Sequence, residues 1–178
     1  MPAKTSPEPS YLVYRDTGEH EGHGWIFNKS ERCSGTEDKN LYTGDYSIVL
    51  GQGDDAVDLY DNKFFVIERK GSVAEFVGNI TQKDKWDDFK NELARMEEFT
   101  HPFVICEFPL SLIQTYPRGS GIPKHIWPSI KVRPQFLLLR LEEIWLRFKT
   151  KFIFADAPGL GRDIASGLFK RVAEAWRN

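Results

Sequence analysis

Cysteine is scarce in this sequence: its 178 residues include only Cys33 and Cys106. A secreted domain that depends on disulfides would be richer in cysteine, so we expect a reducing, intracellular setting with two free thiols. Cys106 lies in an apolar run and is predicted to be in the core, whereas Cys33 lies in a polar segment and is predicted to be in a loop. Neither thiol has a neighbouring base in the sequence, which argues against a cysteine nucleophile.

Long hydrophobic runs are missing as well. The longest, residues 64–67 and 136–139, are far too short to cross a bilayer. Residues 1–10 lack the features of a secretory signal and are predicted to be a disordered N-terminal segment. Residues 11–178 have room for one core and are predicted to form a single domain. We expect no membrane association and a location in the cytoplasm or at the nucleoid.

Acidic residues are absent from one long segment, Phe108 to Leu141, although the net charge of the chain is only −2. The charge near zero excludes a polycationic nucleic-acid coat, but segregated cations in a neutral protein indicate an anionic partner. Cations can neutralise phosphates and aromatic rings can stack on unpaired bases. The predicted DNA contacts are Arg118, Lys124, Trp127, Lys131 and Arg133. The alternative is a proline-rich surface loop whose aromatics, Tyr116 among them, pack onto the core.

The N-terminal half is predicted to form mainly strands. Residues 11–14, 46–50 and 63–69 are β-prone, and the polar stretch 28–40 is predicted to be a loop. The runs 46–50 and 63–69 are expected to form an antiparallel hairpin with a long Gly/Asp-rich connection.

Helices and strands alternate after this hairpin. Trp86, Phe89, Leu93 and Met96 recur at three- and four-residue steps, which indicates one face of an amphipathic helix. The other expected helices cover residues 73–80, 134–149 and the region from 160 onward, and the expected strands cover 102–108 and 152–155. Residues 110–133 are predicted to be an irregular, basic and aromatic excursion. The order predicts an α/β fold with a mixed β-sheet flanked by helices.

Two short motifs carry the chemistry. Thr43-Gly44-Asp45-Tyr46 precedes one strand of the hairpin, and Glu68-Arg69-Lys70 ends the other. Residues i and i+2 of a strand share a face, so Glu68 and Lys70 should project side by side while Arg69 points the other way. If the hairpin brings Asp45 close, two carboxylates and one ammonium meet. The alternative is an ordinary surface pattern of a small structural or interaction protein.

The predicted group of side chains has a chemical use. Two carboxylates suit a hard cation such as Mg²⁺ or Mn²⁺, which takes phosphate oxygens as further ligands. A metal so bound stabilises charge on a phosphodiester and supplies hydroxide, and Lys70 would orient the water or share the developing charge.

The sequence resembles the nuclease domain of XPF-type structure-specific endonucleases, a branch of the PD-(D/E)xK, restriction-endonuclease-like fold. The resemblance rests on Asp16-Thr17-Gly18-Glu19, the Gly44-Asp45 pair and Glu68-Arg69-Lys70, and extends through residues 88–96 and 103–107. It implies that Asp45, Glu68 and the Arg69 carbonyl bind metal and that Lys70 is catalytic. Asp16 would be a further acidic ligand in the same site, with Glu19 supporting it. The Arg69 side chain would hold a phosphate or a neighbouring carboxylate.

Two positions depart from the family pattern. Gly18 stands where D-x-R-E has its arginine, and Ala74 stands where E-R-K-x-x-x-D has its aspartate. Glu75, one position later, would replace that aspartate only with a change of helix register, because one residue rotates a side chain by about 100°. These departures leave Asp45, Glu68 and Lys70 intact.

We therefore expect a Mg²⁺- or Mn²⁺-dependent DNA endonuclease acting on branched, flapped or otherwise structured DNA in recombination, repair or replication. It would be a stand-alone nuclease domain like small phage-encoded or bacterial members, working as a homodimer or with a DNA-targeting protein partner. The alternative is a catalytically weak or inactive member of the fold that binds DNA or scaffolds a partner.

Two other motifs are interpreted as structural. His20 and His23 lack the further ligands that a zinc site needs. Gly159 and Gly161 precede a helix but lack the remaining residues of a nucleotide-binding loop, so a strand-to-helix turn is expected there.

Overall fold

The computed structural model describes residues 10–19, 24–157 and 159–177. Its strands are β1 (Tyr11–Asp16), β2 (Cys33–Lys39), β3 (Tyr46–Leu50), β4 (Val57–Asp58), β5 (Phe65–Lys70), β6 (His101–Cys106) and β7 (Lys151–Phe154). Its helices are α1 (Val73–Thr81), α2 (Lys83–Met96), α3 (Ser111–Gln114), α4 (Pro134–Arg147) and α5 (Leu160–Ala175), with short 3₁₀ turns η1 (Gly53–Asp55) and η2 (Lys124–Ser129).

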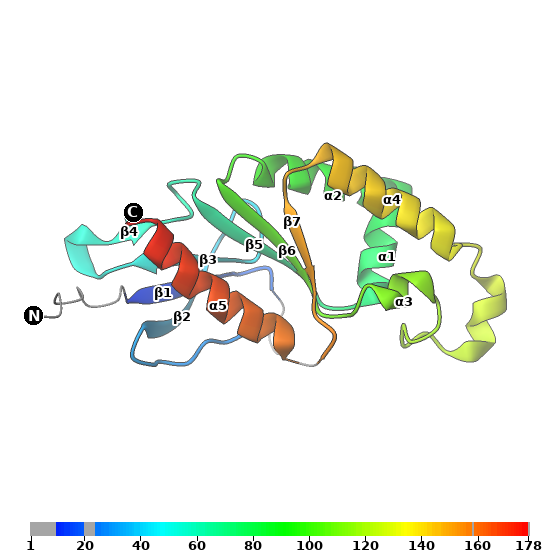
Figure 1. The fold of residues 1–178 in the computed structure, drawn as a ribbon, viewed down its shortest axis with the longest axis horizontal. Helices are drawn as coiled ribbons and strands as arrows, with labels where there is room; N and C mark the ends of the chain where they lie inside the picture. Colours follow the sequence, from blue (N-terminus) through cyan, green and yellow to red (C-terminus); the bar gives the residue numbers. More distant parts are fainter. Residues whose placement is uncertain (1–9, 20–23, 158, 178) are drawn as a thin grey trace, which may run out of the picture.

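The strands form one seven-stranded sheet in the order β2-β1-β3-β5-β6-β7, with β4 paired to β3 (Figure 1). The β1–β3 and β3–β5 pairs are antiparallel, whereas β1–β2, β5–β6 and β6–β7 are parallel. The predicted mixed sheet flanked by helices is confirmed. The N-terminal end of β3 thereby lies beside the C-terminal end of β5, which is the juxtaposition that the candidate site requires.

Strand β2 contradicts the prediction of a loop over residues 28–40. Its sequence, Cys33 to Lys39, is polar after the first residue and carries little β propensity of its own. It forms nevertheless because it pairs in parallel with β1 at the edge of the sheet. Cys33 is consequently buried beneath α5 and not exposed in a loop, while Cys106 is buried as predicted.

Two hydrophobic cores cover the two faces of the sheet. The first lies between β5, β6 and helices α1 to α4, and the second lies between the sheet and α5. Val66 contributes to the first core, and its neighbours Phe65 and Ile67 contribute to the second. The alternation of β5 therefore turns Glu68 and Lys70 toward α1 and α2, and turns Arg69 toward the α5 face.

Helices α1 and α2 form for identifiable reasons. The Ser72 side chain caps α1 by accepting the Glu75 N–H at 3.1 Å. The apolar positions of α2 that were predicted to share a face are all buried, and they pack onto α1 and β5. Because Phe89 and Leu93 are buried, they set the rotation of α2 about its axis, and thereby which of its polar residues face the sheet.

The segment from α3 to α4 leaves the body of the sheet and returns through η2 (Figure 1). Tyr116 is buried in the first core, as the alternative of aromatics that pack onto the core predicts for this ring. No helix within the described ranges is both long and apolar enough to span a membrane.

Candidate active site

Asp45 is held on a tightly constrained segment before β3. The Thr43 N–H donates to the Tyr60 hydroxyl at 2.8 Å, and that hydroxyl in turn donates to the Thr43 carbonyl. Gly44 has φ +72°, and a Cβ there would collide with Val66 and lie 3.0 Å from the Ile67 carbonyl oxygen. Only glycine suits this left-handed, crowded position. The Gly44-Asp45 motif thus fixes the aspartate against β5.

Two hydrogen bonds join Asp45 to the C-terminal end of β5. The Asp45 N–H donates to the Ile67 carbonyl at 2.7 Å, and the Asp45 Oδ2 accepts the Arg69 N–H at 2.6 Å. The carboxylate therefore continues the hydrogen bonding of the sheet beyond the first residue of β3. Since the N–H and C=O of a strand residue point to the same edge, the Arg69 carbonyl is directed toward Asp45 as well.

Glu68 and Lys70 lie side by side on the face covered by α1 and α2, as their spacing predicts. Each retains only 5% of its surface exposed, and the Lys70 Nζ is 2.5 Å from the Glu68 Oε1. The other oxygen, Oε2, is buried without a hydrogen-bond partner among the described residues. A buried carboxylate oxygen without a partner is costly unless a ligand binds it.

Glu92 is a third acidic residue of this group, and it was not among the predicted site residues. Its Oε2 lies 3.8 Å from the Lys70 Nζ, whose ammonium also lies 4.9 Å from the Phe89 ring centroid. The signal was present in the sequence, since Glu92 follows Phe89 by three residues and precedes Met96 by four. That spacing places a carboxylate on the buried face of α2.

Burial and mutual repulsion perturb these carboxyl groups. Burial, and then the charge of Glu68, raises the pKa of Asp45 well above its usual range. The same two causes raise the pKa of Glu92 to about 8. Burial by itself would lower the pKa of Lys70, but the charges of Glu68 and Glu92 outweigh it and raise that pKa. Three carboxyl groups thus compete for the single ammonium of Lys70, and the raised pKa values of Asp45 and Glu92 reflect this crowding.

Arg69 points to the opposite face of β5, where two carboxylates bind it. Its Nε lies 2.8 Å from the Glu107 Oε2, and its Nη1 lies 3.3 Å from the Glu19 Oε2. The guanidinium carbon lies 5.5 Å from the Trp25 ring centroid, and the Trp25 indole N–H donates to the Glu107 Oε1 at 2.9 Å. Of the two partners expected for this side chain, the structure has the carboxylate. Glu107 and Trp25 were not predicted here.

Asp16 is placed beside Asp45 by the pairing of β1 with β3, but its carboxylate is engaged elsewhere. Oδ1 accepts the Leu41 N–H and Oδ2 accepts the Gly18 N–H, both at 2.7 Å. A Cβ at Gly18 would lie 2.6 Å from that Oδ2, so the glycine and this turn belong together. Each oxygen keeps a second lone pair, so the two amides orient the Asp16 carboxylate without excluding it as a metal ligand.

Glu75 and Glu19 lie at the margin of the site. The Glu75 Oε2 accepts the Gly71 N–H at 2.9 Å, which ties it to the turn between β5 and α1. Burial raises the pKa of Glu19, and the charges of Glu68 and Glu75 add to that effect while Arg69 opposes it. Glu19 thus lies within electrostatic reach of both faces of β5.

The predicted DNA contacts lie on the excursion between α3 and α4. Arg118, Lys124, Lys131 and Arg133 are exposed and form no ion pair within the described ranges. Trp127 is half-buried and donates its indole N–H to the Ile122 carbonyl at 2.9 Å. None of them hydrogen bonds or ion-pairs with the Asp45, Glu68 and Lys70 group in the part of the chain that is described. His20 and His23 lie outside the described residues, and Gly159 begins the turn into α5 as expected.

The residues present fit a divalent cation that keeps some of its waters. The carboxylates of Asp45 and Glu68 lie beside the Arg69 carbonyl, and the Glu68 Oε2 is buried without a hydrogen-bond partner in the part of the chain that the structure describes. Across residues 10–19, 24–157 and 159–177, no set of three or more His, Cys, Asp or Glu side chains is arranged for a metal. Mg²⁺ needs only one or two carboxylates when phosphate oxygens and water complete its shell, so this donor set is sufficient.

Comparisons with known proteins agree with the motif analysis. A sequence profile of the ERCC4 domain matches residues 15–155, which include Asp16, Asp45, Glu68 and Lys70. Among solved structures, XPF from Aeropyrum pernix matches with 16% sequence identity and a TM-score of 0.49, over 94% of this chain and 62% of that chain. This chain therefore spans less than two thirds of the length of that protein. A search of curated proteins finds no match.

Proposed function

The chain belongs to the ERCC4 domain family of nucleases, and we propose that it is a metal-dependent endonuclease that hydrolyses phosphodiester bonds in DNA. One observation carries the proposal: Asp45, Glu68 and Lys70 meet at the adjoining ends of β3 and β5, where the buried Glu68 Oε2 has no hydrogen-bond donor among residues 10–19, 24–157 and 159–177 other than a protonated Glu92. Buried polar groups without partners mark sites where a ligand completes the structure. Flap, fork and other branched DNAs are the proposed substrates.

Asp45, Glu68 and the Arg69 carbonyl would hold Mg²⁺ or Mn²⁺. When bound, such an ion acts as a Lewis acid on the phosphate and makes water a stronger nucleophile. Lys70 is oriented by Glu68 and lies between that carboxylate and Glu92, so its ammonium is fixed in position. It would donate a hydrogen bond to the attacking water or to a phosphate oxygen and thus share the developing negative charge.

Cleavage of labelled DNA tests this proposal. Single-stranded, duplex, flap and fork DNA would be incubated with Mg²⁺ or Mn²⁺, and with EDTA as a control, using wild type, Asp45→Ala and Lys70→Ala. We expect metal-dependent nicking that each substitution reduces by at least about a hundredfold. Arg171→Gln is a matched control, because it removes an exposed cation of α5 that has no part in the site or in the predicted DNA contacts. Metal-dependent cleavage that persists at the wild-type rate in Asp45→Ala would contradict the proposed roles.

The second candidate is an inactive or weak member that binds DNA or supports a partner protein. Its specific support is the two departures from the family pattern, Gly18 in place of an arginine and Ala74 in place of an aspartate. It predicts no cleavage and no metal binding that depends on Asp45. A calorimetric Mn²⁺ titration of wild type and Asp45→Ala separates the two, because the active site that we propose loses its heat of binding in the variant.

A further inference from the structure

Tyr42 is an exposed aromatic residue beside the candidate site. Its side chain keeps 67% of its surface exposed, although it lies only three positions before Asp45. The segment that carries it is rigid, because Tyr60 binds both backbone groups of Thr43 and Gly44 packs against Val66. A large ring held in solvent on a fixed segment adds little to the core, and such placement is typical of binding residues.

Two cations accompany this ring. The Arg95 guanidinium carbon lies 5.3 Å from the Tyr42 ring centroid, and the Lys63 Nζ lies 5.8 Å from it. Arg95 belongs to α2 and follows Glu92 by three residues, so both lie on neighbouring positions of one helix face. An exposed aromatic ring with an arginine beside it is the combination that binds single-stranded nucleic acid through base stacking and phosphate neutralisation.

A cavity joins Arg95 to the candidate site. It has a volume of about 290 Å³ and is lined by Asn79, Lys85, Asp88, Phe89, Glu92 and Arg95. Phe89 and Glu92 are the two α2 residues that also approach Lys70. The Arg95 Nε and the Asn79 Oδ1 are buried without hydrogen-bond partners among the described residues. Both residues line the cavity, which is therefore bordered by a guanidinium and a side-chain amide close to the proposed catalytic lysine.

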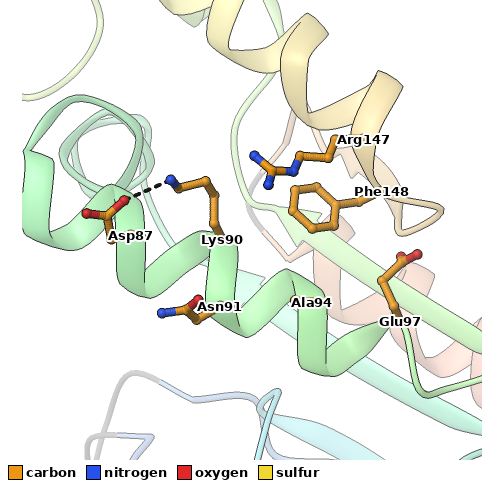
Figure 2. A pocket seen from close by; sticks show the side chains of 7 residues that line it. All are labelled: Asp87, Lys90, Asn91, Ala94, Glu97, Arg147 and Phe148. Atoms are coloured by element: carbon orange, nitrogen blue, oxygen red, sulfur yellow. Dashed lines mark ion pairs between the residues drawn. The ribbon is translucent and has the colours of Figure 1, made fainter.

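The other side of α2 provides a contrast (Figure 2). A larger groove of about 620 Å³ lies there between α2 and the end of α4. Two of its charged groups are bound by neighbours, since Lys90 pairs with Asp87 at 2.8 Å and Glu97 accepts the Lys149 N–H at 2.8 Å, while the Arg147 guanidinium carbon lies 5.7 Å from the Phe148 ring centroid. None of its lining residues belongs to the candidate site, so the groove next to Lys70 is the one that fits a substrate.

We propose that Tyr42 and Arg95 form a stacking platform for an unpaired nucleobase, and that Arg95 and Lys85 bind the adjoining phosphate. The inference rests on the proposed function, since it assumes that DNA reaches the site, and it adds the part of the DNA that is recognised. Bases within a duplex are already stacked on their neighbours and expose no free face. The platform therefore selects a single-stranded segment next to the bond to be cut, as in a flap or a fork.

Binding in EDTA tests the platform without any chemistry. Fluorescence anisotropy would measure the affinity of the full chain for a labelled single-stranded oligo(dT) and for a duplex of equal length. We expect Tyr42→Ala to weaken oligo(dT) binding about tenfold and duplex binding less than twofold, while Tyr42→Trp retains wild-type affinity. Arg95→Gln should reduce the salt dependence of oligo(dT) binding by about one phosphate contact. Trp145→Ala is the matched control, because it removes an exposed aromatic from α4.

The outcomes separate this inference from the nuclease proposal. If Tyr42→Ala binds oligo(dT) like wild type, if it loses single-stranded and duplex binding equally, or if wild type does not bind oligo(dT), the platform is wrong even when the protein cleaves DNA. If Tyr42→Ala loses oligo(dT) binding but the wild type shows no metal-dependent cleavage, the platform stands and the proposed nuclease activity is wrong. The circular dichroism spectrum of each variant checks that it is folded.

Discussion

The two faces of β5 at its C-terminal end carry equally dense charge but differ in how that charge is balanced. On the α5 face, Arg69 has two carboxylate partners and a tryptophan beneath it. On the α1 and α2 face, Lys70 also has two carboxylate partners, Glu68 and Glu92, but Asp45 adds a third carboxyl group, and burial and repulsion raise the pKa of both Asp45 and Glu92. A balanced network stabilises a fold by itself, whereas an unbalanced one is completed by a ligand. The alternation of side chains along β5 therefore places the stabilising ion pairs of Arg69 on one face and the proposed catalytic groups on the other.

The strongest way to separate the faces is to neutralise Asp45. Asp45→Asn keeps an oxygen that can accept the Arg69 N–H but removes a charge that burial and Glu68 disfavour. We expect metal-dependent cleavage to fall by at least about a hundredfold, while the melting temperature of the metal-free protein at pH 8 stays the same or rises. Cleavage assays and thermal unfolding measure the two effects. A large loss of stability would mean that the charged carboxylate is structural.

Removing the Arg69 guanidinium, on the α5 face, should instead lower the stability of the protein. Arg69→Met leaves Glu107 and Glu19 without their cation, and we expect a loss of about 3 kcal/mol in the free energy of unfolding. Urea unfolding measures it. The control is Arg171→Met, which breaks an exposed pair with Glu174 on α5 and should leave the urea midpoint unchanged. Equal effects of the two substitutions would show that the Arg69 network contributes no stability.

The pH dependence of stability should come from the unbalanced face. The pKa of Glu92 is raised to about 8 in the folded state, so the folded protein binds more protons than the unfolded chain between about pH 4.5 and pH 8. The free energy of unfolding of the metal-free protein should therefore fall over that range, by up to about 1.4 kcal/mol for each pH unit, and level off above it. Glu92→Gln should flatten the slope. Urea titrations at several pH values measure this, and a slope unchanged in the variant would assign it to another group.

The smallest expected effect comes from removing the indole donor on the α5 face. Trp25→Phe keeps an aromatic ring next to Arg69 but removes the indole donor to Glu107. We expect a loss of about 1 kcal/mol in unfolding free energy with cleavage within about twofold of wild type. If cleavage falls much more than stability does, the α5 face positions the catalytic groups as well as supporting the strand.

The rule that residues i and i+2 of a strand share a face was sufficient to predict which side chains of β5 lie together. The same was true of α2, where the spacing of Phe89, Leu93 and Met96 predicted the buried face correctly. Both are local patterns, because one strand or one helix contains all the information. Strand β2 could not be predicted in this way, since its polar sequence becomes a strand only through pairing with β1.

The partners of the motif residues depend on packing between distant segments. Trp25 and Glu107 are 82 positions apart in the sequence, and they meet at Arg69 only because β6 lies beside β5. Glu92 reaches Lys70 because the buried face of α2 sets the rotation of that helix about its axis. The catalytic and metal-binding roles of Asp16, Asp45, Glu68 and Lys70 remain predictions, and the cleavage and titration experiments above test them.

The hydrogen bond from the Arg69 amide to the Asp45 carboxylate makes this amide a reporter for the site. Its proton is bound to the same group that would hold the metal, so its resonance in a ¹⁵N-resolved spectrum should shift when Asp45 is protonated or when Mg²⁺ is added. Its exchange with solvent deuterium should slow as metal strengthens this end of the sheet. A single backbone signal could thus follow occupancy of the site in a protein that has no chromophore there and needs no label on its substrate.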